Sequence, residues 1–204
     1  STLGRAFVFW GLLLSLPFVR ARPLSENQQK EIGQVLDSIF SADGKGSADL
    51  QSLTKFDALL FENEKVVRSL AWKSYRKGGA LDEMQEDHSA GKVISGEYVS
   101  PYFVRRVGKK PEGGWSLVIA MHGGGKAPKQ LNDSQWQIMQ HYYKDHPGDG
   151  GYIYLALRAP TDEWNGFYTD YVYPLVARLI RQFLVCEEVD PDRVFLIGYS
   201  HGGY

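Results

Sequence analysis

Apolar positions recur at two different spacings along the chain, and the spacing changes near Lys92. Before that point the period is about 3.6 residues, which predicts helices. The first helix begins at Ser25, because Gln28 stands three residues later and the pair resembles a capping box. The apolar face of this helix is formed by Ile32, Val35, Leu36 and Ile39.

The segment Ser41–Ser47, SADGKGS, interrupts the helical pattern. Its acidic spacing does not fit a calcium-binding loop, so we interpret it as a linker. A second helix is predicted to run from Asp49 through Leu70. Residues 22–91 are therefore expected to form a small helical region, and their sequence indicates no function.

After Lys92 the pattern is typical of strands. GEYVSPYFVRRVG and GGWSLVIAMHGGG are rich in β-formers, and the KKPEGG between them predicts a hairpin turn. Three runs are apolar as in strands buried on both faces, namely Ser116–Met121, Tyr152–Pro160 and Val194–Ile197. Helical patterns over residues 133–143 and 170–188 separate them. This alternation predicts an α/β fold with a mainly parallel sheet flanked by helices.

The N-terminus has the pattern of a secretory signal. Arg5 precedes the apolar stretch Ala6–Phe18, and the small residues Val19 and Ala21 define a cleavage site after residue 21. The stretch is shorter than a bilayer span. We therefore expect residues 1–21 to be removed and the protein to be secreted or extracytoplasmic, without stable membrane insertion. The alternative is a buried helix or strand.

Composition narrows the class of protein. With 23 basic and 24 acidic residues, the formal net charge is -1, which is not the signature of a nucleic-acid-binding protein. The histidines have no cysteine or carboxylate partners at metal-ligand spacing, so no metal or other cofactor is expected. Cys186 is the single cysteine and lies in an apolar helical stretch, which predicts a buried and inert thiol.

The pentapeptide Gly198–Gly202, GYSHG, matches G-x-S-x-G directly after an apolar strand. In that context the motif predicts a sharp turn from strand to helix, with the serine held in a strained conformation. Small flanking residues avoid clashes in such a turn. Ser200 is therefore the candidate nucleophile, and a buried structural serine is the alternative.

A second motif, HGGG, follows the strand that ends at Met121. Attack of a serine on a carbonyl group produces an oxyanion, which backbone N–H groups stabilise. Glycines allow a loop backbone to approach that closely. A phosphate-binding P-loop is excluded, because Ala120 and Ala127 stand where it needs glycine and Ser or Thr. A plain flexible turn remains an alternative.

Residues 114–204 resemble the first half of an α/β-hydrolase. MHGGG is similar to the oxyanion loop of esterases. VDPDRVFLIGYSHGG resembles the elbow of esterase D-like, polyhydroxyalkanoate depolymerase-like and prolyl oligopeptidase-like hydrolases. The resemblance implies that residues 92–204 are the N-terminal part of a hydrolase domain.

The resemblance also implies roles for individual residues. Ser200 is the nucleophile, and the N–H groups of His201 and of Gly123 or Gly124 form the oxyanion hole. His122 is expected to brace the oxyanion loop rather than to act as base. The acid and histidine of the triad would follow Ser200, beyond residue 204. We therefore expect the chain to be an inactive fragment of a longer enzyme.

The resemblance leaves the substrate open. Trp164, Phe167 and Tyr168 follow a strand end where ligands bind in α/β sheets, so they would wall an acyl or aromatic group or pack under the loop. We expect a serine hydrolase that cleaves small-molecule or polymeric carboxylic esters through an acyl-enzyme. The alternatives are a prolyl oligopeptidase-like peptidase and a non-catalytic hydrolase-like binding module.

Overall fold

The computed structural model describes residues 22–40, 50–77, 82–163 and 166–204. The expected secretory signal, the linker Ser41–Ser47 and Trp164 therefore lie outside the described residues. The chain divides into two units, Ser1–Lys77 and Gly78–Tyr204. Across the described ranges, the helices are too short or too polar to cross a membrane.

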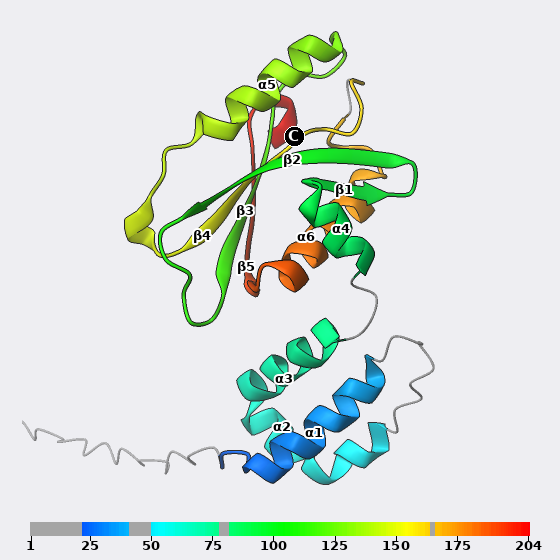
Figure 1. Ribbon diagram of the computed structural model, residues 1–204, viewed down its shortest axis with the longest axis vertical. Helices are drawn as coiled ribbons and strands as arrows, with labels where there is room; N and C mark the ends of the chain where they lie inside the picture. Colours follow the sequence, from blue (N-terminus) through cyan, green and yellow to red (C-terminus); the bar gives the residue numbers. More distant parts are fainter. Residues whose placement is uncertain (1–21, 41–49, 78–81, 164–165) are drawn as a thin grey trace, which may run out of the picture. The chain divides into compact units, whose positions relative to one another are not determined.

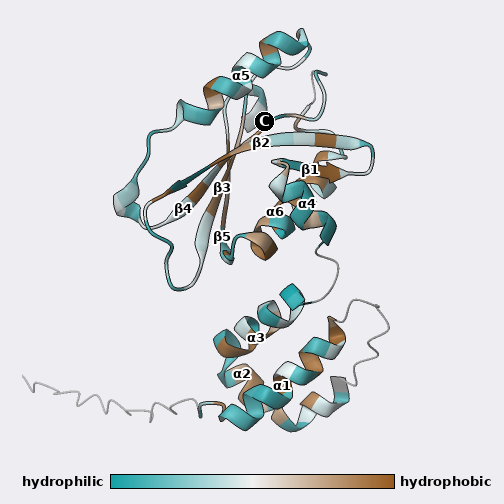
Figure 2. Cartoon of the chain, viewed as in Figure 1, coloured by the Kyte–Doolittle hydropathy of each residue, from teal (hydrophilic) through white to brown (hydrophobic). Residues whose placement is uncertain are grey.

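The first unit is helical, as expected. Its elements are α1 (Glu26–Ile39), the 3-10 helix η1 (Leu50–Phe56), α2 (Asp57–Glu62) and α3 (Glu64–Lys77). The predicted capping box is confirmed, since Ser25 and Gln28 each bond the backbone N–H of the other. Figure 2 shows apolar and polar residues alternating along α1 and α3. The buried apolar residues are Leu24, Ile32, Leu36 and Phe56.

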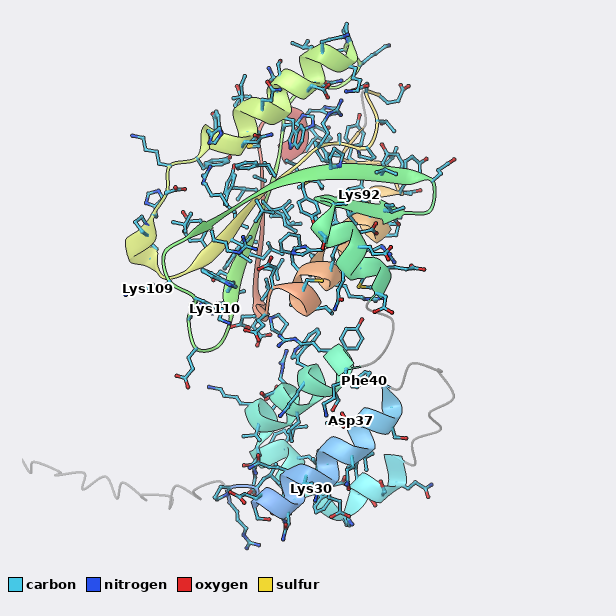
Figure 3. All side chains as sticks on the ribbon, viewed as in Figure 1. Lys30, Asp37, Phe40, Lys92, Lys109 and Lys110 are labelled. Atoms are coloured by element: carbon cyan, nitrogen blue, oxygen red, sulfur yellow. The ribbon has the colours of Figure 1, made fainter. Side chains whose placement is uncertain are left out.

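Polar and aromatic contacts join α1 to α3. The Asp37 carboxylate accepts a hydrogen bond of 2.9 Å from the Lys77 ammonium group. At the end of α1, the ring of Phe40 packs edge-on against Tyr75, with 5.5 Å between centroids. Figure 3 labels Asp37 on α1 and Phe40 directly after it. The pairing of α1 with α3 buries the apolar face that the sequence predicted.

The continuous helix predicted from Asp49 through Leu70 is wrong. Asn63 separates α2 from α3, with φ -117° and ψ 32° at this position. Its amide Nδ2 donates to the carbonyl oxygens of Leu59 and Arg22, each at 2.8 Å. An asparagine side chain that bonds the neighbouring backbone competes with helix continuation, which apolar spacing alone does not reveal.

The second unit is an α/β layer structure. Its elements are α4 (Asp82–Ser89), β1 (Lys92–Ser95), β2 (Tyr98–Val107), β3 (Trp115–Met121), α5 (Lys129–Tyr142), η2 (Pro147–Asp149), β4 (Tyr152–Leu157), α6 (Val172–Cys186), β5 (Val189–Gly198) and η3 (Ser200–Gly203). The sheet order is β1-β2-β4-β3-β5. α5 covers one face of this sheet, and α4 and α6 lie on the other (Figure 1). α4 packs on α6 and β1, so it belongs to this unit.

The sheet is mixed, and the prediction of a mainly parallel sheet is wrong. The predicted parallel pairing is confirmed for three strands, because β3 is parallel to both β4 and β5. However, β2 is antiparallel to both β1 and β4. The predicted hairpin between β2 and β3 is also wrong, because β4 lies between them. Turn residues specify where the chain reverses, but strand partners depend on the whole sheet.

Burial differs between the parallel strands. Leu117, Ile119 and Ala120 of β3 are fully buried, as predicted for a strand covered on both faces. The strand predicted over Val194–Ile197 is longer, and it lies at an edge of the sheet as far as the described residues extend. Phe195 and Leu196 are 51% and 54% exposed there, so the described residues do not cover β5 on both faces.

Candidate active site

The candidate nucleophile lies on the turn between β5 and η3. Tyr199 continues the extended backbone, with φ -113° and ψ 132°, and Ser200 then takes φ +52°. A positive φ is uncommon for residues other than glycine, and such a conformation costs on the order of 1–3 kcal/mol. The structure therefore has the strained turn that the sequence predicted around Ser200.

The glycines of the motif are required by close backbone packing. A Cβ atom on Gly198 would overlap the carbonyl group of Gly202 on the other side of the turn. A Cβ atom on Gly202 would overlap the carbonyl oxygens of Met121 and His122. The turn can therefore close on itself and on the end of β3 only because neither position has a side chain.

The parallel pairing of β3 and β5 brings the two sequence motifs together. Met121 pairs with Gly198, and the Tyr199 N–H donates to the Met121 carbonyl oxygen at 3.1 Å. The next residues on each strand then meet. A Cβ atom on Gly123 would lie 3.3 Å from the Cβ of Ser200 and 3.1 Å from Cδ1 of Tyr199. The glycine loop thus lies in van der Waals contact with the elbow.

His122 is a buried neutral residue that braces this loop. Its Nε2 atom accepts the Ala159 N–H at 3.1 Å, so the proton is on Nδ1, which lies 2.7 Å from the Gly123 carbonyl oxygen. The side chain is buried among loop atoms, and burial lowers the pKa of His122 from 6.5 to about 4. Both ring nitrogens therefore have backbone partners, Nδ1 in the glycine loop and Nε2 in the loop after β4.

The three glycines of the loop differ in what their N–H groups do. Gly125 donates to the Asn132 side-chain oxygen at 2.9 Å. The N–H groups of Gly123 and Gly124 have no acceptor in the part of the chain that the structure describes. Gly124 has φ +110°, a conformation that favours glycine. Two N–H groups of the loop thus have no hydrogen-bond acceptor among the described residues.

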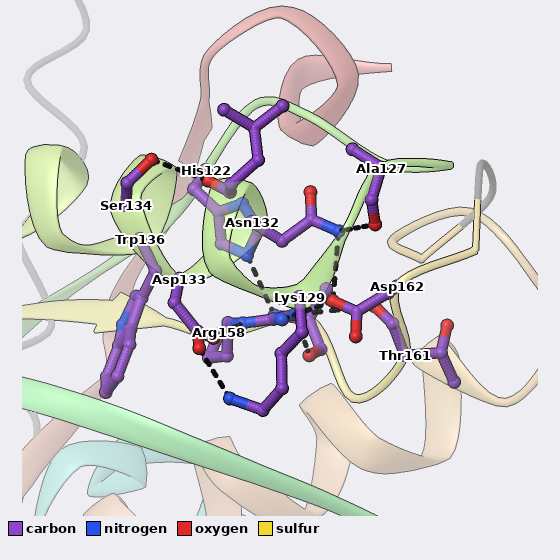
Figure 4. Close-up of polar contacts among 12 residues, drawn as sticks. His122, Ala127, Lys129, Asn132, Asp133, Ser134, Trp136, Arg158, Thr161 and Asp162 are labelled. Carbon is purple, nitrogen blue, oxygen red and sulfur yellow. Dashed lines mark hydrogen bonds and ion pairs between the residues drawn. The ribbon is translucent and has the colours of Figure 1, made fainter.

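A network of polar side chains lies next to the glycine loop (Figure 4). The sequence pattern did not predict this network. Arg158, at the end of β4, forms ion pairs with Asp133, at 3.0 Å, and with Asp162. Asn132 donates to Asp162 at 2.9 Å. Arg158 is only 5% exposed. The signal in the sequence is a charged residue that directly follows a fully apolar strand.

The remaining predicted site residues that the structure describes lie in a small cleft or beside it. Phe167 and His201 line the cleft together with the glycine loop. Phe167 is buried, and its ring packs edge-on against His122 with 5.0 Å between centroids. Tyr168 is 38% exposed and packs on the His201 ring, at 5.1 Å. Phe167 thus packs under the loop, whereas Tyr168 remains accessible beside the elbow.

The other histidines have partners elsewhere in the second unit. His88 lies between the carboxylate of Glu187, at 2.7 Å from Nε2, and the hydroxyl of Tyr102. His141 packs against a phenylalanine ring, and His146 is exposed to solvent. A catalytic base and acid that follow Ser200 in sequence therefore stay a prediction.

Comparisons of the chain with protein-family models, with curated proteins and with solved structures find no match.

Proposed function

We propose that the protein is a serine hydrolase that cleaves carboxylic esters through an acyl-enzyme. The observation that carries this proposal is the contact between Ser200, in its left-handed turn, and a glycine loop with two unused N–H donors. A strained serine beside preorganised donors is the arrangement that acyl transfer requires. The resemblance to α/β-hydrolases and the candidate site support the same class of reaction.

In the proposed reaction, the Ser200 hydroxyl oxygen attacks the ester carbonyl carbon while a base removes its proton. The carbonyl oxygen becomes an oxyanion, which the N–H groups of the elbow and the loop stabilise. The tetrahedral adduct then releases the alcohol, which takes the proton from the base. Water hydrolyses the acyl-serine ester by the same steps in the second half of the cycle.

The peptide geometry favours Gly124 over Gly123 as the loop donor. The His122 carbonyl oxygen lies against Gly202, so the Gly123 N–H, on the same trans peptide, points away from that turn. The Gly123 carbonyl faces the ring of His122, so the Gly124 N–H points away from the ring. The N–H of His201, one residue after the nucleophile, is the expected second donor.

The base and acid belong to the proposal as residues that follow Ser200, in the order of the α/β-hydrolase triad. Neutral His122 is unsuited to the role, because both of its ring nitrogens are held by backbone groups, those of Gly123 and Ala159. Secretion remains part of the same proposal. The accessible ring of Tyr168 beside the elbow is a contact surface for the acyl group of the ester.

The test compares turnover of p-nitrophenyl esters and peptide p-nitroanilides by the natural protein and by two alanine variants. Ser200→Ala removes the proposed nucleophile, and Ser134→Ala removes a half-buried serine of α5 whose hydroxyl donates to the Leu131 carbonyl oxygen. We expect ester hydrolysis to be abolished in Ser200→Ala and retained in Ser134→Ala. Faster cleavage of the anilides would indicate a peptidase instead, and undiminished turnover by Ser200→Ala would exclude the assigned nucleophile.

A further inference from the structure

Asn132 is a buried polar residue within helix α5, where its side chain is not required for the helix to form. It is the fourth residue of α5 and is 1% exposed. Asparagine is a weaker helix former than alanine, and a buried amide is costly unless it is hydrogen-bonded. The hydrogen bonds of this side chain therefore indicate why an asparagine is present at position 132.

The Asn132 amide joins three segments of the chain. Its Oδ1 atom accepts the Gly125 N–H at 2.9 Å. Its Nδ2 atom donates to the Ala127 carbonyl oxygen at 3.2 Å and to the Asp162 carboxylate at 2.9 Å. One amide thus connects the glycine loop, the entrance to α5 and the loop after β4 (Figure 4).

The orientation of this amide is set by Asp162. Burial alone would raise the pKa of Asp162, but hydrogen bonds from Arg158 and Asn132 outweigh it and the pKa is lowered. An ionised carboxylate only accepts hydrogen bonds, so it selects the NH2 side of the Asn132 amide. The oxygen side is therefore left to face Gly125.

Asn132 also limits the path of the loop at Gly124. A Cβ atom on Gly124 would lie 2.6 Å from Oδ1 of Asn132, so the loop backbone passes directly over the amide oxygen. The same oxygen accepts the N–H of Gly125. Because of this bond, the Gly125 N–H cannot donate to an oxyanion. The bond also fixes the orientation of the peptide group between Gly124 and Gly125.

We propose that Asn132 is a positioning residue for the oxyanion hole, with Asp162 and Arg158 setting its orientation. This inference rests on the proposed function. Asn132 does not touch the substrate. It holds the glycine loop so that the Gly124 N–H is aimed at the developing oxyanion, and its loss affects the transition state more than the bound ester.

The test uses three variants of the natural protein. Asn132→Ala removes all three hydrogen bonds. Asn132→Asp keeps an acceptor for Gly125 but places a second carboxylate against Asp162. The double variant Asn132→Asp/Asp162→Asn restores a donor–acceptor pair, because the carboxylate at position 132 then accepts from the amide introduced at position 162. The double variant also keeps the net charge of the protein.

Turnover of p-nitrophenyl butyrate is measured per active site, with active sites counted by fluorophosphonate titration. We expect Asn132→Ala to lower kcat about a hundredfold with KM changed less than about threefold, as for a misplaced catalytic group. Binding of a boronic acid, whose tetrahedral adduct occupies the oxyanion hole, weakens in parallel. Asn132→Asp behaves similarly, and the double variant regains most of the lost kcat.

A residue with a purely structural role would lower the number of active sites or the Tm, but not kcat per active site. If kcat per active site in Asn132→Ala stays within about twofold of the natural protein, the positioning role is overturned. A double variant no better than Asn132→Asp alone overturns it as well. A natural protein without Ser200-dependent turnover contradicts the proposed function itself, and this inference with it.

Discussion

Gly123 packs against Ser200, with only 3.3 Å between the Ser200 Cβ and the position that a Cβ on Gly123 would take. The two residues follow different strands, β3 and β5, and they meet because these strands pair in parallel with Met121 opposite Gly198. The contact brings a candidate nucleophile to a loop that has free N–H donors. The predictions below test the parts of this arrangement separately.

The first prediction concerns the oxyanion loop. Gly124→Val introduces a β-branched residue at φ +110°, so the loop moves and its N–H is displaced. We expect kcat for an ester to fall by about a hundredfold or more, the effect of losing one oxyanion donor. Gly148→Ala is the matched control, because no atom lies within 4 Å of its new Cβ. Unchanged kcat in a folded Gly124→Val variant would contradict the donor role of this loop.

The second prediction concerns the elbow. Gly202→Ala places a Cβ atom on the carbonyl groups that end β3, where only backbone can move. We expect the free energy of unfolding to fall by about 3 kcal/mol, since overpacking of this kind costs about 1–3 kcal/mol or more. Urea unfolding measures the change, again against Gly148→Ala. Equal unfolding free energies of the two variants would contradict the close packing of Gly202 against the end of β3.

The third prediction concerns pH. The pKa of His122 is lowered from 6.5 to about 4 by burial, so the unfolded chain binds the proton more readily. The contribution of His122 to stability is therefore complete above pH 6.5 and is lost as the pH drops toward 4. A shift of this size corresponds to about 3 kcal/mol of unfolding free energy.

Urea unfolding between neutral pH and about pH 4 measures this slope in the natural protein and in His122→Gln. We expect the slope to be smaller in His122→Gln, because the titrating ring is gone. His141→Gln is the control, since it removes an exposed histidine of α5. Equal slopes in all three proteins would mean that His122 titrates alike in the folded and unfolded states.

The fourth prediction concerns Cys186. Burial, with a smaller effect from the Glu187 carboxylate, raises the pKa of the thiol. Because the thiolate is the reactive form, we expect Ellman's reagent to modify the native protein at least about tenfold more slowly than the urea-unfolded chain. Peptide mass spectrometry assigns the modification to Cys186, the single cysteine of the 204 residues. Equal rates in the two states would contradict the prediction of an inert thiol.

The sequence predicted the parts of the fold that depend on local pattern. The apolar runs of β3, β4 and β5 and the intervening helices were found, although α5 begins at Lys129 rather than at Asp133. The helix begins directly after Pro128, and its first turn contains polar residues that the apolar pattern did not include. The partner of β2 was not found, because pairing depends on the energy of the whole sheet rather than on the turn residues.

The candidate site was partly predictable, because some of its residues belong to local sequence motifs. G-x-S-x-G and HGGG are motifs whose glycines are required by backbone geometry, and the structure brings Ser200 and Gly123 together. The network of Arg158, Asp162 and Asn132 has no motif. It arises where α5 and the loop after β4 meet in space, and such proximity cannot be read from spacing along one chain.

The most direct measurement of the central claim is covalent labelling of the natural protein by a fluorophosphonate. The reagent forms a bond to an activated serine oxygen and releases fluoride, so it reports the nucleophile without a choice of substrate. We expect one adduct, located by peptide mass spectrometry on Ser200, absent from Ser200→Ala and retained in Ser134→Ala. Labelling that persists in Ser200→Ala, or a natural protein that the reagent does not modify, would contradict the account.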